Sequence, residues 1–136
     1  MLPGQLNSQY LFTQKGKCMT DITIYHNPRC SKSRATLALL ENNKAANTIV
    51  VINYLETPPS MQTLQQIIAL LGFGSARQLM RTTEAQYKAL ALKDESREAV
   101  LLKAMVENPQ LIERPIVLAN GKAVIGRPPE SALDIL

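Results

Sequence analysis

Two strand-like segments on either side of a helical segment limit the folds that this chain can form. Residues 21–25 read as a strand, and the continuous β-branched run at 48–53 predicts a second strand that is buried on both faces. Between them, the apolar residues of 31–43 predict a helix that ends at Asn42 and Asn43. A strand, a helix and a strand within about 30 residues form a βαβ unit, whose two strands run parallel with a right-handed crossover.

The rest of the chain predicts a helical block and then a hairpin. Ser60 is a candidate N-cap for a helix that ends at residues 72–74, and further helices are expected at 76–81, 83–90, 96–107 and 129–136. Two apolar strands, 116–119 and 122–125, flank Asn120-Gly121, which is the strongest short hairpin signal. The predicted fold class is therefore α/β: a four-stranded mixed sheet in the order βαβ, helical insertion at about 57–112, and ββα.

Length and composition bound both the domain organisation and the function. The 136 residues fit one domain, at 19–136, preceded by an extension at 1–18 that lacks periodicity and is expected to be disordered. Aromatic residues are only 4% with no Trp, which disfavours a nucleic-acid surface, whereas a net charge of +4 suits a small anion. No segment reads as a membrane span or a secretory signal, so a cytoplasmic protein is expected.

Cys30 is the first candidate for chemistry because of its place in the predicted fold. It lies in the loop between the first strand and the first helix, where free backbone amides stabilise a thiolate and can also hold an anion. His26 and Arg34, four residues before and after it, are candidates for adding positive charge. The plain alternative is a small buried cysteine that happens to fall in a loop.

The second cysteine does not provide an obvious partner for Cys30. A thioredoxin-type dithiol would have a cysteine at the position of Ser33, so the predicted site contains a single thiol. Cys18 lies in the N-terminal extension and is not expected to act as a resolving thiol. An external thiol must therefore complete any catalytic cycle that oxidises Cys30 or leaves an adduct on it.

Three arginines are candidates for binding an oxyanion. Arg114 precedes the third strand and Arg127 follows the fourth, so both are expected at the same sheet edge as Cys30, with Arg81 as a third candidate. Planar guanidinium groups give a tetrahedral oxyanion paired hydrogen bonds, which a lysine does not offer. Taken one by one, each of these arginines is more often a solvated surface residue.

A series of motifs, in order along residues 21–136, resembles a known family. These motifs are Ile22-Thr-Ile-Tyr-His-Asn-Pro-Arg-Cys30, Ser33-Arg34, Tyr54-Leu-Glu-Thr-Pro-Pro-Ser60, Leu79-Met-Arg81, Glu113-Arg-Pro-Ile-Val117, Gly126-Arg-Pro128 and Leu133-Asp-Ile-Leu136. They resemble the arsenate reductases of the glutaredoxin-dependent type, in the ArsC/Spx-like branch of the thioredoxin superfamily. The resemblance implies a thioredoxin-like fold with a cis-proline at Pro115.

The resemblance also implies a reaction and its residues. Cys30 would be the nucleophile that attacks arsenate and His26 would help to hold it as a thiolate. The residues implied to bind substrate are Arg81, Arg114, Arg127, Ser33 and Arg34. Glutathione would be the co-substrate and glutaredoxin the protein partner of a monomeric enzyme. No metal and no bound cofactor enters this chemistry.

Two departures and two alternatives accompany this prediction. Arg29 and Lys32 make the cysteine loop more basic than the family pattern, and the N-terminal extension lies outside that pattern. One alternative is a monothiol oxidoreductase that acts on another oxyanion or on glutathionylated proteins. The other is a non-catalytic, Spx-like transcription-regulator module, and the serine at position 33 counts against it because those regulators commonly carry a redox pair there.

Overall fold

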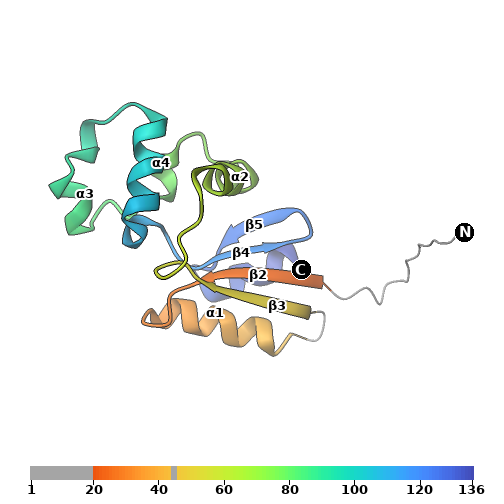
Figure 1. The fold of residues 1–136 in the computed structure, drawn as a ribbon. Coiled ribbons are helices and arrows are strands. Elements are labelled where there is room, and N and C mark those ends of the chain that lie inside the picture. The colour runs from red at the N-terminus through yellow and green to blue at the C-terminus, as the bar shows by residue number, and fades with distance from the viewer. Residues whose placement is uncertain (1–19, 44–45) are drawn as a thin grey trace, which may run out of the picture.

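A four-stranded mixed sheet forms the centre of the computed structural model, which describes residues 20–43 and 46–136 (Figure 1). The sheet order is β3-β2-β4-β5, with β2 at Thr20–His26, β3 at Ala46–Asn53, β4 at Ile116–Ala119 and β5 at Lys122–Ile125. Strands β2 and β3 are parallel, and the other two pairs are antiparallel. The predicted mixed sheet is thus confirmed, while the predicted extension at 1–18, with Cys18, lies outside the described residues.

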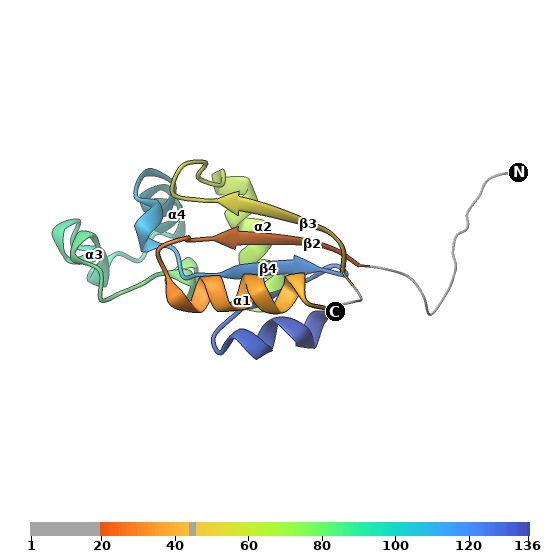
Figure 2. The same ribbon diagram turned by 90° about the horizontal axis from the view of Figure 1, so that it is seen from below.

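Helices cover both faces of the sheet. The α-helix α1 (Ser31–Glu41) and the 3-10 helix η5 (Pro129–Ile135) lie together against one face, as Figure 2 shows from below. On the opposite face lie α2 (Met61–Leu71) and α4 (Glu98–Glu107). Alternate residues of each strand face opposite cores: Ile22, Ile24 and Val117 pack under α1, whereas Tyr25 and Ile116 pack under α2 and α4.

The burial predicted for the second strand is wrong. β3 is an edge strand that pairs only with β2, and Val50 and Val51 are 48% and 46% exposed. A βαβ unit places two strands side by side but does not decide which of them becomes central. Here β4 pairs with the free edge of β2, so β2 occupies the middle of the sheet and β3 stays at its edge.

Local sequence signals account for the turns and helix ends near the sheet. Ser60 Oγ accepts a hydrogen bond from the Thr63 N–H at 3.1 Å and caps α2 as predicted, and Gly72 ends α2 with φ of 76°. Asn120 and Gly121 both have positive φ, 55° and 71°, as a tight hairpin turn requires. The predicted hairpin is therefore confirmed.

The helical insertion is built from shorter pieces than predicted. Between α2 and β4, the structure has η2 at Ala76–Leu79, α3 at Ala85–Ala89, η3 at Leu92–Asp94 and η4 at Pro109–Leu111 besides α4. The final helix is also of the 3-10 type. Such short pieces have weak periodicity, because each buries only one or two side chains.

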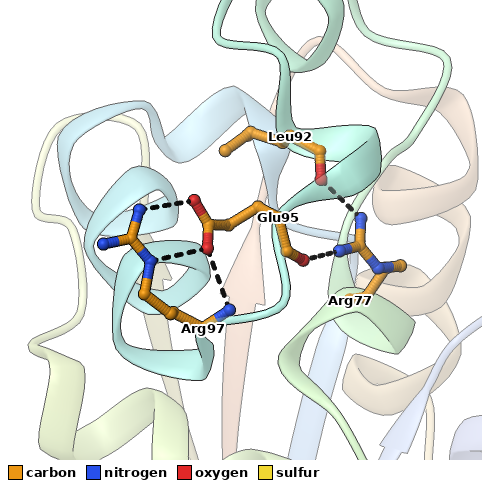
Figure 3. Close-up of polar contacts among 4 residues, drawn as sticks. All are labelled: Arg77, Leu92, Glu95 and Arg97. Atoms are coloured by element: carbon orange, nitrogen blue, oxygen red, sulfur yellow. Dashed lines mark hydrogen bonds and ion pairs between the residues drawn. The ribbon is translucent and has the colours of Figure 1, made fainter.

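Arg77 holds these short pieces together (Figure 3). Its guanidinium donates a hydrogen bond to the Leu92 carbonyl at 2.7 Å and another to the Glu95 carbonyl. It also donates a hydrogen bond to the Tyr87 hydroxyl. The Glu95 carboxylate in turn accepts hydrogen bonds from Arg97, which lower the pKa of Glu95 to about 2. One cation thereby joins η2, α3 and η3 and orders the segment that follows Arg81.

No helix in the described part of the chain is long and apolar enough to cross a membrane.

A pair of matched valine truncations tests the edge position of β3. Val117 is fully buried in β4, so Val117→Ala should lower the free energy of unfolding by about 2 kcal/mol. Val51 is half exposed, so Val51→Ala should cost less than about 1 kcal/mol. Urea unfolding measures both values, and equal costs would contradict an exposed β3.

Candidate active site

The pairing register brings three chain segments to the same end of the sheet, where β2 and β5 finish and β4 begins. Tyr25, near the end of β2, pairs with Ile116 at the start of β4, and Ile116 pairs with Ile125 at the end of β5. Cys30 follows β2, Arg114 precedes β4 and Arg127 follows β5, so all three residues lie at this end of the sheet. The shared edge expected from the sequence is confirmed.

Local hydrogen bonds shape the loop that carries Cys30. The Asn27 side chain accepts from the Arg29 N–H at 2.9 Å, and the Asn27 carbonyl accepts from the Cys30 N–H at 3.0 Å. Arg34 donates to the Pro28 carbonyl at 2.9 Å from the first turns of α1. Cys30 occupies the N-cap position of α1 and is partly exposed. This geometry sets its sulfur at the amide end of the helix.

The surroundings of Cys30 favour the thiolate. Burial alone raises the pKa of the thiol, but the backbone N–H groups of Ser33 and Lys32 and the charge and hydrogen-bonding capacity of Arg114 outweigh it. The net effect lowers the pKa of Cys30 below its usual value. Helix amides and a nearby cation are two of the means by which proteins lower the pKa of a cysteine.

The surroundings of His26 favour its neutral form, not the positive charge that the sequence suggested. It is buried, and its Nδ1 lies 2.7 Å from Ser33 Oγ. Burial, followed by the positive charge of Arg34, lowers the pKa of His26, with Glu41 acting weakly in the other direction. His26 is therefore neutral at physiological pH, and Arg114 is the cation that acts on the sulfur.

Three arginines line one pocket, and Cys30 is not among the lining residues. Its volume is about 300 Å³, and its lining consists of Met80, Arg81, Thr82, Thr83, Glu113, Arg114 and Arg127. Arg81, Arg114 and Arg127 are the three arginines singled out in the sequence. Because Arg114 both lines the pocket and acts on Cys30, an anion in the pocket and the sulfur would share one guanidinium.

Carboxylates and carbonyls hold these guanidinium groups in place. Arg81 forms an ion pair with Glu84 at 3.0 Å, and Arg114 lies 3.9 Å from Glu113. An Arg127 nitrogen lies 3.5 Å from the Arg114 carbonyl. Arg114 Nε is buried and has no hydrogen-bond partner among residues 20–43 and 46–136. This nitrogen is covered by protein atoms, so it is not itself open to a ligand in the pocket.

Ser33 and Arg34, the other two predicted substrate-binding residues, do not line the pocket. Ser33 is fully buried, and its Oγ accepts a hydrogen bond from the Asn27 N–H at 3.0 Å in addition to its contact with His26. Arg34 is exposed and braces the Pro28 carbonyl. Both residues support the cysteine loop from its inner and outer sides.

Sequence reasoning missed several members of the site. Thr82, Thr83 and Glu113 line the pocket; the two threonines follow Arg81, and Glu113 stands before Arg114 in a motif that the resemblance uses but that did not mark it as a site residue. Tyr54, the first residue after β3, is 1% exposed; burial raises the pKa of its hydroxyl, although Arg114 and a hydrogen bond from Asn27 act in the other direction. Tyr54 is therefore a buried, uncharged phenol that interacts electrostatically with Cys30, Arg81 and Arg114.

A close approach between α1 and the loop after β5 fixes the site. A Cβ added to Gly126 would lie 2.7 Å from Thr36 Oγ1 and 3.0 Å from Pro115 Cγ. Thr36 Oγ1 also lies 3.2 Å from the Gly126 carbonyl. The Arg114–Pro115 peptide bond is cis, as the resemblance implies, and so is Arg127–Pro128. Only glycine fits between the helix and the proline.

Comparisons with known proteins agree on one family. The sequence model of the ArsC family matches residues 25–135. The chain is 56% identical over 116 residues to the uncharacterised protein YfgD of Escherichia coli K12, covering 85% of this chain and 96% of that protein. It is 49% identical over 119 residues to an arsenate reductase of Neisseria meningitidis serogroup B, covering 87% and 100%. The structure of an arsenate reductase from Vibrio cholerae is similar, with a TM-score of 0.81 and 50% identity over 87% of this chain and 99% of that one.

A double-mutant cycle tests the contact at Gly126. Gly126→Ala should lower the free energy of unfolding by about 1–3 kcal/mol, because the new methyl group overlaps Thr36 and Pro115. The same change should cost less in a Thr36→Ala background, which removes both Thr36 atoms from the contact. Denaturant unfolding of the four proteins gives the coupling, and strict additivity would contradict the proposed overlap.

The role of Arg114 in activating the thiol is tested by alkylation kinetics in a Cys18→Ser background. Arg114→Gln should raise the pKa of Cys30 and slow its reaction with iodoacetamide at pH 7 by about three- to tenfold, since a close cation shifts a pKa by about one unit. Arg81→Gln is the matched control, because Arg81 does not contribute to the lowered pKa. Identical pH profiles for the two variants would refute the assignment.

Proposed function

The chain belongs to the ArsC family, and we propose that it is an arsenate reductase that uses Cys30 as nucleophile and depends on glutathione and glutaredoxin. The observation that carries the proposal is the position of Arg114, which links an activated thiol to a pocket with two further arginines. A volume of about 300 Å³ suits a small oxyanion, because it lies at the low end of ligand pockets. The arsenate reductases among the relatives support this substrate.

The first step of the proposed reaction joins sulfur to arsenic. Arsenate binds with its charge against Arg81, Arg114 and Arg127, and the Cys30 thiolate attacks the arsenic atom. One oxygen takes up protons and leaves as water, which gives a thioester of arsenic(V) on Cys30. Because Arg114 contacts both reactants, it holds the anion within reach of the sulfur and offsets the repulsion between two negative groups.

Two further thiols complete the cycle. The glutathione thiolate attacks the sulfur of Cys30, the sulfur–arsenic bond breaks, and its electron pair reduces arsenic to arsenite. The product is a mixed disulfide between Cys30 and glutathione, and glutaredoxin removes the glutathione by thiol–disulfide exchange. Glutathione and NADPH then reduce glutaredoxin. The lowered pKa of Cys30 favours both its attack and its later departure as a thiolate.

The need for outside thiols follows from the surroundings of Cys30. Cys30 is the only cysteine within the described residues, and its thiol is free. Ser33 occupies the position where a dithiol enzyme would have its second cysteine. The Ser33 hydroxyl is buried and engaged by His26 and Asn27. We also propose that the enzyme is a monomer without a bound cofactor. Its place would be the cytoplasm, where the glutathione pool keeps thiols reduced.

A coupled assay tests the proposed reaction. Arsenate-dependent oxidation of NADPH is followed in a mixture of glutathione, glutaredoxin and glutathione reductase. Wild type and Cys18→Ser should turn over at similar rates, whereas Cys30→Ser should lose essentially all activity because it lacks the nucleophile. A large loss in Cys18→Ser would refute the single-thiol mechanism.

The oxyanion pocket is tested in the same assay by charge-preserving changes. Arg81→Lys and Arg127→Lys should each lower kcat/KM for arsenate by about tenfold or more, because a lysine cannot donate paired hydrogen bonds. Lys93→Arg, in the exposed η3, is the control and should leave the kinetics unchanged. If Cys30 is activated but arsenate gives no turnover, the pocket serves another oxyanion or the thiol serves glutathionylated proteins.

A further inference from the structure

We propose that Arg29, Lys32 and Arg34, here called the basic rim, form a docking surface for an acidic protein thiol carrier that regenerates Cys30. The inference rests on the proposed function and adds to it where and how the protein partner binds. All three side chains are exposed, and in the sequence they stand at positions −1, +2 and +4 from Cys30. None of them lines the arginine pocket.

The basic rim differs from the pocket in how its charge is balanced. In the pocket, Arg81 has Glu84 as a partner and Arg114 has Glu113. Among residues 20–43 and 46–136, no carboxylate forms an ion pair with Arg29, Lys32 or Arg34. Arg34 is engaged only by the uncharged Pro28 carbonyl. The charge of the basic rim is therefore open to solvent and available to a partner molecule that approaches Cys30 from solvent.

The proposed reaction requires a protein thiol carrier to approach the outer side of the cysteine loop. In the regeneration step, the thiolate of the carrier attacks the glutathione sulfur, a disulfide forms between carrier and glutathione, and Cys30 leaves as a thiolate. The carrier must therefore bring its own thiol to the exterior of the cysteine loop. Arsenate, in contrast, needs only the pocket. Three exposed cations in the loop and first turn that flank Cys30, none of them in an ion pair within the described residues, fit a carrier with acidic residues around its thiol.

A protein partner fits these observations better than a nucleic acid. The basic rim is confined to the short loop and first turn around one cysteine, and Figure 1 shows this loop between β2 and α1. A duplex would be contacted along a longer basic stripe, and the chain has few aromatic residues for stacking on single strands. The expected role is faster association rather than tighter final binding.

The regeneration step can be tested without arsenate. In a Cys18→Ser background, Cys30 is converted to its mixed disulfide with glutathione, and a glutaredoxin of net negative charge is added in single-turnover experiments. Mass spectrometry follows the loss of glutathione at several NaCl concentrations. Neutralising the basic rim with Arg29→Gln/Lys32→Gln should lower the second-order rate constant by about five- to tenfold at low salt and flatten its salt dependence.

Two controls separate docking from chemistry. Lys93→Gln/Lys122→Gln removes the same charge from exposed positions in η3 and at the start of β5, and it should behave as wild type. β-Mercaptoethanol, an uncharged small thiol, should release glutathione from rim variant and wild type at equal rates. An equal slowing with β-mercaptoethanol would mean that the variant alters Cys30 itself, and it would overturn the docking proposal.

The remaining outcomes are also decisive. Unchanged glutaredoxin rates in the rim variant would overturn the proposal, and loss of binding to a DNA or RNA fragment in that variant alone would reassign the basic rim to nucleic acid. If glutaredoxin fails to act on any form while β-mercaptoethanol succeeds, the protein-carrier proposal fails. Arsenate reduction would then still stand or fall by the separate coupled assay.

Discussion

The antiparallel pairing of β4 with both β2 and β5 determines where the functional side chains lie. Because Tyr25, Ile116 and Ile125 stand in one row across the sheet, the loop after β2, the approach to β4 and the exit from β5 end at the same edge. A shift of one residue in this register would turn Ile116 from the core under α2 to the opposite face. The apolar alternation of the strands therefore also specifies the position of the thiol relative to Arg114.

Packing on both faces of the sheet holds the arginines of the pocket close to one another at this end of the sheet. Thr36 of α1 approaches Gly126 so closely that no side chain fits there, which ties the middle of the helix to the segment that carries Arg127. On the other face, Arg77 binds the carbonyls of η3 and Glu95 and so orders the insertion beyond Arg81 (Figure 3). The arginines repel one another, and this cost is offset by Glu84, Glu113 and backbone carbonyls.

The sequence was most informative where one residue type has one physical use. Asn120-Gly121 specified the hairpin, because both positions need positive φ, and Cys30 was recognisable from its place before a helix. Features that depend on contacts between distant parts of the chain could not be predicted from the sequence. The apolar run of β3 looks the same in a central strand and at an edge, and its exposure depends on where β4 pairs. Thr82 enters the site through the fold of the insertion, whose short helices lack a clear period, and Glu113 enters it next to Arg114.

Ser33 shows how the loop geometry and the chemistry depend on each other. Its hydroxyl sits fully buried between His26 and the Asn27 N–H, and its own N–H favours the Cys30 thiolate. A cysteine in its place would be a weaker hydrogen-bond partner for both neighbours and would be buried away from an incoming thiol. The chain thus has a well-ordered activating loop and no resolving thiol within it. Reduction then depends on how an external thiol reaches Cys30, and the unpaired charges of Arg29 and Lys32 lie where that approach begins.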